Sequence, residues 1–152
     1  MTSEEMKKFR HPTGKMNLWR GIDYKVYLKY KKEGVMEPKR QKYHASKKRL
    51  YFATNWRISA NYAIVKEEPC ILEFNKLDLD LYELVRDGET YFNRDAINYF
   101  YTTKPISIKE ITYVYTLKKD KEVRELFEDR YKRDLLIRPR SVEKYWNKKK
   151  YR

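Results

Sequence analysis

The chain places its apolar residues in short groups, and the spacing within each group predicts the element that it forms. Residues 17–22 have a strand-like pattern that ends at Gly21, and Asp23 can cap the helix that follows. That helix has an apolar face at positions i, i+3 and i+4, formed by Tyr24, Tyr27 and Leu28. Because Gly34 is a typical helix stop, the sequence predicts a strand and then a helix before this glycine.

A second unit of the same kind follows a stretch that is dense in basic side chains. We predict that this stretch, residues 35–49, is an exposed basic loop. Residues 50–54 predict a strand, and Asn55 predicts the N-cap of a helix over 56–66. The packed face of this helix is expected to contain small residues beside larger ones, namely Trp56, Ala60, Ala63 and Ile64. A short apolar strand is predicted at 69–74.

The second half of the chain is patterned less regularly. Residues 77–86 have Leu at every second position and then a helix-like patch, which a turn at Asp87 and Gly88 ends. The next predicted strands are 96–103 and 112–117, with a break at Pro105 between them. These strands come after most of the predicted helices, which favours an α+β fold over an alternating α/β fold.

The C-terminal part predicts a helix and then a basic end. Residues 119–134 have apolar positions at helical spacing, and Ser141 can cap a short terminal helix. The last residues, 148–152, are predicted to form a solvated basic tail. We expect three parts in the chain: a flexible basic N-terminus over 1–15, a core over 16–118, and a C-terminal helix with its tail over 119–152.

Composition narrows the class of protein. With 152 residues, of which 41% are hydrophobic, the chain has the size of one domain with one core. Cys70 is the only cysteine, which excludes a disulfide scaffold, and with only His11 and His44 available we expect no metal centre. No apolar run is long enough to cross a membrane, and residues 1–10 do not resemble a secretory signal, so we expect a cytoplasmic protein. The charged fraction of 38%, with Gln41 as the only glutamine, resembles proteins adapted to high temperature.

The net charge of +14 is concentrated at the two ends of the sequence. Residues 1–50 hold 15 basic and 5 acidic side chains, residues 51–112 hold 7 and 10, and residues 113–152 hold 14 and 7. Net charges of +10 and +7 at the ends favour a polyanionic partner, and nucleic acid is the expected one. Lysine-rich surfaces that only keep the protein soluble are the alternative, because no base-reading motif or zinc knuckle is present.

Two basic clusters are the candidate nucleic-acid contacts. They consist of Lys39, Arg40, Lys42, Lys47, Lys48 and Arg49 in the predicted loop, and Lys148, Lys149 and Lys150 in the predicted tail. Tyr43, within the first cluster, is a candidate for stacking on a base. A groove that holds a polyanion needs cations on both walls, so the clusters would act together if the fold brings them to one cleft.

Several kinds of catalytic motif are absent from the sequence. The four glycines stand at 14, 21, 34 and 88, and they form neither a Walker loop nor a dinucleotide-binding fingerprint. No Gly-x-Ser-x-Gly elbow occurs. Carboxylates that could serve a magnesium-dependent nuclease are clustered at Asp78, Asp80, Glu83 and Asp87. A solvated acidic face is the favoured reading of that cluster.

Arg20 and Thr54 are the polar residues that stand out within apolar strands. Arg20 precedes Gly21 at a strand end, where a guanidinium can hold a phosphate or a ribose with its planar fork of donors. It can equally be an arginine on an exposed strand face. Thr54 ends the next strand, where its hydroxyl can orient a ligand or can cap the following helix together with Asn55.

Taken in order, these segments resemble the ADP-ribosyltransferase superfamily. Residues 18–21 (Leu-Trp-Arg-Gly) resemble its first-strand motif, an aromatic residue followed by Arg-Gly. Residues 51–54 (Tyr-Phe-Ala-Thr) and 59–63 (Ser-Ala-Asn-Tyr-Ala) are similar to its second motif, in which a Ser or Thr at a strand end precedes a helix. Residues 69–74 resemble the central strand that follows, and 104–106 (Lys-Pro-Ile) the turn before the late strands. The ordered set covers about two-thirds of the chain.

The resemblance implies a split β-sandwich with flanking helices, in which NAD lies in a cleft between two small sheets. It assigns Arg20, with the adjacent Gly21, to the NAD phosphate and ribose, and Thr54 to the residue that braces the site. Tyr62 becomes a candidate to stack on nicotinamide, although an aromatic residue on a helix is more often part of a core. NAD, as a substrate, is the expected cofactor.

The chain departs from the superfamily at the catalytic carboxylate. Where the family has Glu, shortly before the Pro-Ile turn, this sequence has Asn98 and Tyr99. The reaction needs an anion at this position, because departure of nicotinamide leaves an oxocarbenium-like centre whose positive charge the anion stabilises. The nearest upstream acids are Asp95 and Glu89, which are the candidate substitutes. Two further hypotheses remain. One is NAD-related chemistry without Glu, as in the RNA 2′-phosphotransferase branch, but this sequence lacks the His motifs of that branch. The other is that the fold serves only as a binding module.

The sequence therefore predicts transfer of ADP-ribose from NAD to a macromolecule. Nucleic acid is the favoured acceptor and a protein acceptor is possible, because the basic ends would hold a polyanion. A non-catalytic nucleic-acid-binding protein on the same fold is the rival, and the absent Glu favours it. A structural or assembly protein that uses its tyrosines at a subunit interface is a third hypothesis.

Overall fold

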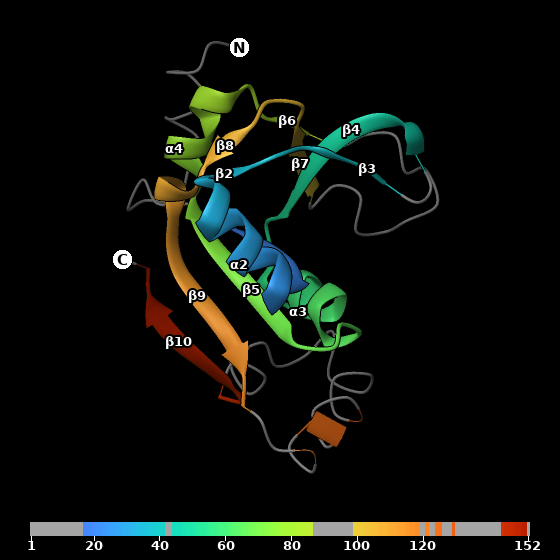
Figure 1. Ribbon diagram of the computed structural model, residues 1–152, viewed down its shortest axis with the longest axis vertical. Coiled ribbons are helices and arrows are strands. Elements are labelled where there is room, and N and C mark those ends of the chain that lie inside the picture. Colours follow the sequence, from blue (N-terminus) through green and yellow to red (C-terminus); the bar gives the residue numbers. More distant parts are fainter. Residues whose placement is uncertain are drawn as a thin grey trace.

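The computed structural model describes residues 17–41, 44–86, 99–118, 121, 124, 125, 129 and 144–151. They form an α+β protein in which three helices accompany a mostly antiparallel eight-stranded sheet and a small second sheet (Figure 1). The large sheet has the order β10-β9-β5-β1-β4-β7-β6, and β3 also pairs with β4. The α+β fold class predicted from the sequence is confirmed.

The first strand and helix follow the local signals in the sequence. Strand β1 is Asn17–Asp23, and the Asp23 carboxylate accepts a hydrogen bond of 3.2 Å from the Lys25 amide at the start of helix α2, Tyr24–Glu33. Gly34 ends α2 with φ of 76°, a left-handed conformation that glycine adopts at no steric cost. The buried face of α2 is formed by Tyr27 and Tyr30, whereas Leu28 is 47% exposed, so the prediction for Leu28 was wrong.

The second unit contains the predicted strand, helix and strand, but its first strand begins earlier than predicted and its helix ends earlier. Strand β4 is His44–Ala53, helix α3 is Trp56–Ile64 and strand β5 is Pro69–Asn75. The Asn55 side chain caps α3 by accepting a 2.8 Å hydrogen bond from the Arg57 amide. The predicted packed face of α3 is buried, and β5 is buried from Pro69 to Phe74 because strands lie on both sides of it.

The remaining strands complete both sheets. These elements are β2 Val35–Met36, β3 Lys39–Gln41, helix α4 Lys76–Leu79 with a short 3₁₀ turn Asp80–Tyr82, β6 Val85–Arg86, β7 Tyr99–Thr102, β8 Ile106–Ser107 with a 3₁₀ turn Ile108–Glu110, β9 Ile111–Leu117 and β10 Trp146–Lys150. Strand β2 pairs with β8 in the small sheet. The register of the large sheet places β5 between β1 and β9.

The large sheet is almost divided between β1 and β4. Strand β1 pairs with β5 along its whole length, from Asn17 to Asp23, but with β4 only where Trp19 lies opposite Ala53. Beyond this pair, β4 continues beside β7 and β3. The sheet therefore consists of two parts, β10-β9-β5-β1 and β3-β4-β7-β6, joined at one residue pair (Figure 1).

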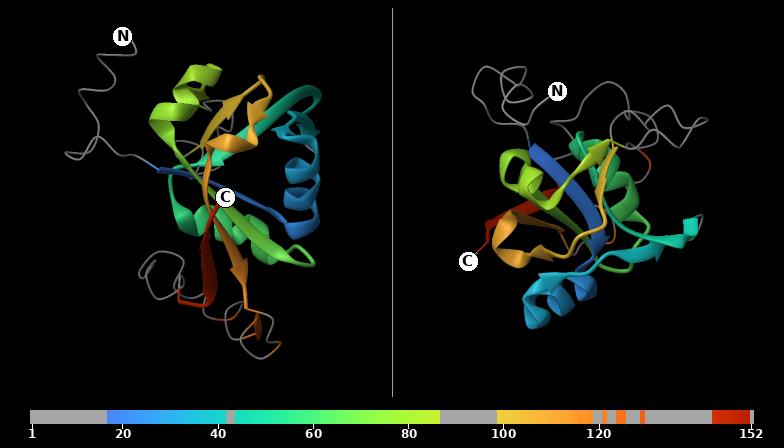
Figure 2. Two further views of the ribbon diagram at one scale, coloured as in Figure 1. Left: turned by 60° about the vertical axis from the view of Figure 1, so that its left-hand side comes forward. Right: turned by 90° about the horizontal axis from the view of Figure 1, so that it is seen from above.

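Helices α2 and α3 cover opposite faces of the strand β1. Successive strand residues point to opposite faces, and Arg20 contacts Tyr30 of α2, whereas Gly21 lies against α3. The α2 face holds the larger core, in which Phe52 and Phe74 pack edge to face with ring centres 5.1 Å apart. The two further views show the helices on either side of the strands (Figure 2).

Two predictions about the basic segments are wrong. Residues 35–49 are not a loop, since β2, β3 and the first half of β4 lie there. Residues 148–150 belong to the edge strand β10 rather than to a tail. Strands β3 and β4 pair with each other as a hairpin within the first segment, whereas β2 pairs with β8 and β10 pairs with β9. Lysines on edge strands are common because their charge prevents pairing with other molecules.

Other predictions are only partly covered by the described residues. Residues 77–86 form a short helix, a 3₁₀ turn and a short strand in place of the helix-like patch. The strand predicted over 96–103 corresponds to β7, and 96–98 lie outside the described residues. Within the predicted helix 119–134, the described Lys121, Arg124, Glu125 and Asp129 are helical. The predicted cap Ser141 and the predicted N-terminal segment 1–15 also lie outside the described residues.

Replacement of Gly21 should test the close packing of α3 on β1. A Cβ atom at this position would lie 2.0 Å from the Ser59 carbonyl oxygen, so we expect Gly21→Ala to destabilise the fold by about 3 kcal/mol. Urea unfolding measures this loss. As a control, Gly34→Asn meets no atom within 4 Å and should cost less than about 1 kcal/mol, since Asn tolerates the left-handed conformation. Equal losses for the two variants would contradict the packing argument.

Candidate functional site

Arg20 lies on β1 next to the place where β1 and β4 separate. Its Nη1 donates a hydrogen bond of 3.1 Å to the Tyr51 carbonyl oxygen on β4, and its Nη2 donates one of 3.3 Å to the Tyr30 hydroxyl on α2. Both interactions fix the plane of the guanidinium group. The Nε atom is buried and has no hydrogen-bond partner in the described part of the chain.

No described carboxylate forms an ion pair with Arg20, which is partly buried. Its neighbours Tyr51 and Tyr30 offer a carbonyl and a hydroxyl oxygen, which accept hydrogen bonds but carry no formal charge. A partly buried cation without a counter-ion favours binding of an anion, because the anion compensates the lost hydration. The arrangement therefore suits a phosphate group.

Gly21 allows the backbone of α3 to approach β1 directly. The helix residue at this contact, Ser59, has a buried hydroxyl without a hydrogen-bond partner among the described residues. Such a hydroxyl commonly bonds to a backbone carbonyl within its own helix, and a buried one without a partner costs free energy. Ser59 opens the segment 59–63 that resembles the superfamily's second motif, but the sequence assigned it no role, because its spacing does not distinguish it from a small packing residue.

Thr54 follows Ala53, the residue of β4 that pairs with Trp19, and it precedes α3. The capping hydrogen bond of α3 comes from Asn55. Thr54 is partly buried and lies at the junction between the joined and the separated parts of β1 and β4. The structure thus brings Arg20, Gly21 and Thr54 to one short region of the sheet.

Tyr62 lies apart from Arg20. It stands on α3 and is 50% exposed, and its hydroxyl accepts a 3.2 Å hydrogen bond from the Tyr99 hydroxyl on β7. The two rings meet edge to face, with centres 6.1 Å apart. Since α2 and α3 cover opposite faces of β1, the Arg20 side chain and Tyr62 lie on different sides of that strand.

The candidate carboxylates Asp95 and Glu89 lie outside the described residues, as does Asn98. The described part of the neighbouring strand, β7, consists of Tyr99–Thr102 and contains no acidic residue. Tyr99 itself is buried. Any carboxylate that acts beside β7 must therefore come from another segment.

Glu73 is a buried acid that the sequence analysis did not select. It is 6% exposed on the central strand β5, and its Oε1 accepts hydrogen bonds of 3.0 Å from both the Trp19 Nε1 and the Tyr115 hydroxyl. The carboxylate joins β1, β5 and β9 on the side of the sheet that α3 covers. The one available signal was a lone acid inside the apolar segment 69–74.

The first basic cluster lies on the hairpin of β3 and β4. Lys39, Arg40, Lys47 and Lys48 are exposed there, and the register places Lys39 opposite Arg49 and Arg40 opposite Lys48. Arg49 differs from the others because it is only 4% exposed. Its Nη1 donates a 3.0 Å hydrogen bond to the Tyr51 hydroxyl, and its guanidinium carbon lies 4.0 Å from the centre of the Tyr101 ring. Lys42 and Tyr43 are outside the described residues.

The second basic cluster lies on β10, at the opposite end of the sheet. Lys148, Lys149 and Lys150 are exposed, and the Lys148 ammonium lies 4.0 Å from the centre of the Tyr113 ring. Strands β9, β5 and β1 separate β10 from β4, and Figure 1 shows the hairpin and β10 on opposite sides. The two clusters therefore do not line one groove.

The described residues contain no group of three or more His, Cys, Asp or Glu side chains placed to hold a metal ion. Within the acidic cluster considered above, Asp80 forms a 3.0 Å ion pair with the buried Lys76, and Glu83 lies 3.9 Å from Lys104. Asp87 is outside the described residues. No helix of the described segments has the length and apolar character needed to cross a membrane.

Comparison of the chain with protein-family models, with curated proteins and with solved structures gives no match.

Substitution of Glu73 should show how much its hydrogen bonds stabilise the sheet. In Glu73→Leu, the Trp19 indole N–H and the Tyr115 hydroxyl lose their shared acceptor, and we expect a loss of about 2–5 kcal/mol in unfolding free energy. Glu73→Gln retains a carbonyl oxygen and should cost less than about 1.5 kcal/mol. Guanidinium unfolding of both variants checks this order, and an equal loss for Gln and Leu would rule out a role for the acceptor oxygen.

Proposed function

We propose that the protein transfers ADP-ribose from NAD to a macromolecular acceptor, with nucleic acid favoured over protein. The observation that carries the proposal is the guanidinium of Arg20, which is held by Tyr51 and Tyr30 and has no anionic partner in the described part of the chain. The pyrophosphate of NAD is an anion of the type that such a fixed fork of donors binds.

Two features of the fold support the same proposal. The sheet is divided beside Arg20, with the single pair Trp19 and Ala53 joining its parts, as expected for the split β-sandwich of an ADP-ribosyltransferase-like fold. Thr54, the residue that the resemblance assigns to brace the site, follows Ala53 directly and so lies in the same short region of the sheet as Arg20 and Gly21.

The reaction has defined requirements for charge. The bond between the nicotinamide nitrogen and ribose C1′ breaks, and nicotinamide departs with the electron pair. An acceptor hydroxyl or amine then forms a bond to C1′ and loses its proton. A carboxylate near C1′ would stabilise the positive ribose, and Asp95 and Glu89 are the residues of this chain proposed for that role.

A non-catalytic nucleic-acid-binding module is the second candidate function. The described part of β7 lacks an acid, and the hydroxyl groups of Tyr99 and Tyr62 are hydrogen-bonded to each other near the expected carboxylate position. The net charge of +14 favours binding of nucleic acid under either function.

Calorimetric titration with NAD tests the role of Arg20. We expect Arg20→Ala to weaken binding by about 10- to 100-fold, which corresponds to loss of charge-assisted hydrogen bonds of about 1.5–3 kcal/mol. Arg20→Lys should not restore the affinity, because an ammonium group lacks the planar fork. Arg40→Ala on the exposed hairpin is a matched control and should bind as the wild type does. No heat of binding for the wild type at millimolar NAD would refute the proposal.

Transfer assays with labelled NAD test the carboxylate. With RNA, DNA and protein acceptors offered separately, we expect Asp95→Asn to lower the rate more than Glu89→Gln does, because Asp95 is closer in sequence to the position of the family's Glu. Loss of an acid or base group commonly lowers a rate by about 10²–10⁴-fold. A larger effect of Glu89→Gln would assign the role to Glu89. NAD binding without transfer to any acceptor would favour the binding module.

A further inference from the structure

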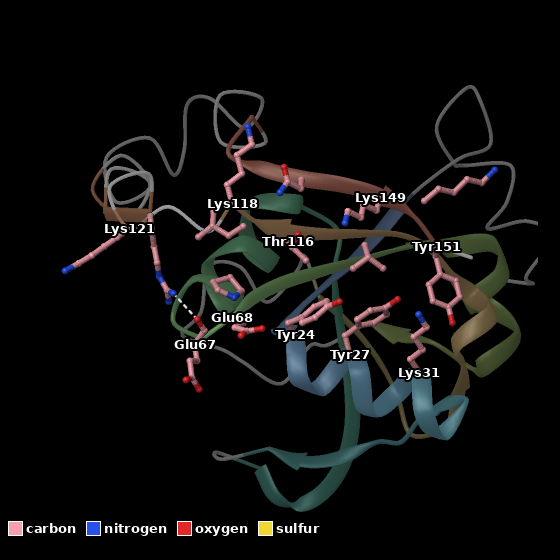
Figure 3. Close-up of a pocket in the computed structure, with 16 residues that line it drawn as sticks. Tyr24, Tyr27, Lys31, Glu67, Glu68, Thr116, Lys118, Lys121, Lys149 and Tyr151 are labelled. Atoms are coloured by element: carbon pink, nitrogen blue, oxygen red, sulfur yellow. Dashed lines mark hydrogen bonds between the residues drawn. The ribbon is translucent and has the colours of Figure 1, made fainter.

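A groove with a volume of about 970 Å³ lies between helix α2 and the strands β9 and β10 (Figure 3). It is on the side of the sheet that α2 covers, which is also the side to which Arg20 points. Its lining includes lysines, tyrosines and the turn that follows α3. The function proposed above does not assign a role to this groove.

Three tyrosine rings lie together in the groove. The ring centres of Tyr24 and Tyr27 are 5.6 Å apart, and those of Tyr27 and Tyr151 are 6.3 Å apart. Tyr27 is 7% exposed, and the other two are half-buried. None of their hydroxyl groups is joined by a hydrogen bond to another of the described residues that line the groove (Figure 3). Tyr24 and Tyr151 are the two rings with exposed surface, and accessible aromatic rings can stack on bases.

Tyr27 and Tyr151 stay uncharged at physiological pH. Burial, together with the neighbouring Tyr151 and Tyr24, raises the pKa of Tyr27 to about 12. Burial also raises the pKa of Tyr151. Neither of these two rings therefore carries a tyrosinate that would repel a phosphate, and both hydroxyl groups remain hydrogen-bond donors.

Lysines stand on both walls of the groove. They are Lys31 in the last turn of α2, Lys118 and Lys121 after β9, and Lys149 and Lys150 on β10. Among the described carboxylates, none forms an ion pair with Lys31, Lys118, Lys149 or Lys150. Lys121 lies 4.0 Å from Glu125 in an exposed pair, which contributes little. A polyanion between the walls would meet cations from two sides.

Two acidic residues, Glu67 and Glu68, line one end of the groove and oppose a polyanion there (Figure 3). Glu67 pairs with Lys25 at 3.1 Å. Arg124 donates hydrogen bonds to the carbonyl oxygens of Glu67, Lys66 and Ile64 at the end of α3, so it anchors the turn. The positive charge that faces a ligand is therefore mainly that of the lysines.

We propose that this groove binds single-stranded nucleic acid, with phosphates at the lysines and unpaired bases at Tyr24 and Tyr151. A duplex keeps its bases paired and cannot present their faces to tyrosines recessed between two walls, which is why the single strand is favoured. An acidic peptide would use the lysines but would leave the aromatic rings without a matching group. The inference rests on the proposed function in one respect, namely that the bound strand would be its acceptor.

The groove and Arg20 are connected through α2. Tyr27, in the groove, and Tyr30, which holds Arg20, are three residues apart and occupy neighbouring positions on one face of the helix. A strand in the groove would thus lie on the same side of the sheet as the Arg20 guanidinium.

Fluorescence anisotropy with a labelled 12-nucleotide oligo(U) tests the proposal on the full chain in the absence of NAD. The double variant Lys31→Ala/Lys149→Ala should reduce the salt slope of the affinity by about 1.4, because each phosphate contact on a single strand contributes about 0.7. Tyr151→Ala should weaken binding by about 5- to 150-fold if the ring stacks on one base. The matched control Lys29→Ala/Lys109→Ala removes the same charge from exposed positions that do not line the groove and should leave the slope unchanged.

Further probes separate the possible occupants. Oligo(dT) should bind with similar dependence on the lysines, whereas a 12-base-pair RNA duplex and poly-glutamate should bind at least 10-fold more weakly than oligo(U). Equal or tighter binding of the duplex or of poly-glutamate would overturn the proposal. The variant Lys47→Ala/Lys48→Ala tests the hairpin as the rival site. Loss of binding in that variant but not in the groove variant would also overturn the proposal, as would absence of saturable oligo(U) binding at low salt.

The same measurements on Arg20→Ala distinguish this inference from the proposed function. Oligo(U) affinity should be unchanged in that variant even where NAD binding is lost. Since Lys31 and Lys149 are exposed, their substitution should leave the fold intact, which circular dichroism can verify. Failure of NAD binding alone would leave the groove proposal in place, and failure of oligo(U) binding alone would leave the NAD proposal in place.

Discussion

The pairing of strand β1 is the constraint on which the candidate site depends. Along its whole length β1 is paired with β5, but it meets β4 only at Trp19 and Ala53. Unpaired backbone groups beyond this point must find other partners, because buried polar groups without a partner are costly. The Tyr51 carbonyl oxygen accepts a hydrogen bond from the Arg20 guanidinium. This one hydrogen bond links β1 to β4 beyond their single residue pair, and it also fixes a cation at that position.

Helix packing determines which side of β1 each candidate residue occupies. Gly21 permits α3 to lie directly on the strand, and α2 covers the other face through Tyr27 and Tyr30. As a result Arg20 and Ser59 present their unpartnered atoms on different sides of one strand. A ligand that used both groups would have to pass around the edge of β1 where β4 has separated from it.

The basic side chains act in two distinct ways. Arg20 and Arg49 are held by hydrogen bonds from their guanidinium groups to tyrosine oxygens, and Arg49 also lies over the Tyr101 ring. The lysines of the hairpin and of β10 are exposed, and most of them keep the conformational freedom of a long side chain. A fixed guanidinium selects a ligand by geometry, whereas lysines attract a polyanion through charge and lose affinity with salt.

The sequence by itself determined the elements whose signals are local. Asp23 and Asn55 cap their helices, and Gly34 ends α2, because a cap involves only residues within one turn. The strands at 17–22 and 69–74 were also predictable, since their apolar patterns reflect burial in the middle of the sheet.

The tertiary structure alone decided the features that depend on distant partners. The basic segments 35–49 and 148–150 carry no strand-like apolar pattern. Their strands exist because β2 pairs with β8, β10 pairs with β9, and β3 pairs with β4 in a hairpin that continues into the large sheet. The packing of α2 and α3 on opposite faces of β1 likewise separates Arg20 from Tyr62. The order of the strands places Lys149 of β10 across one groove from Lys31 of α2. Spacing along a chain fixes which face of an element a residue occupies, but pairing between elements fixes what that face meets.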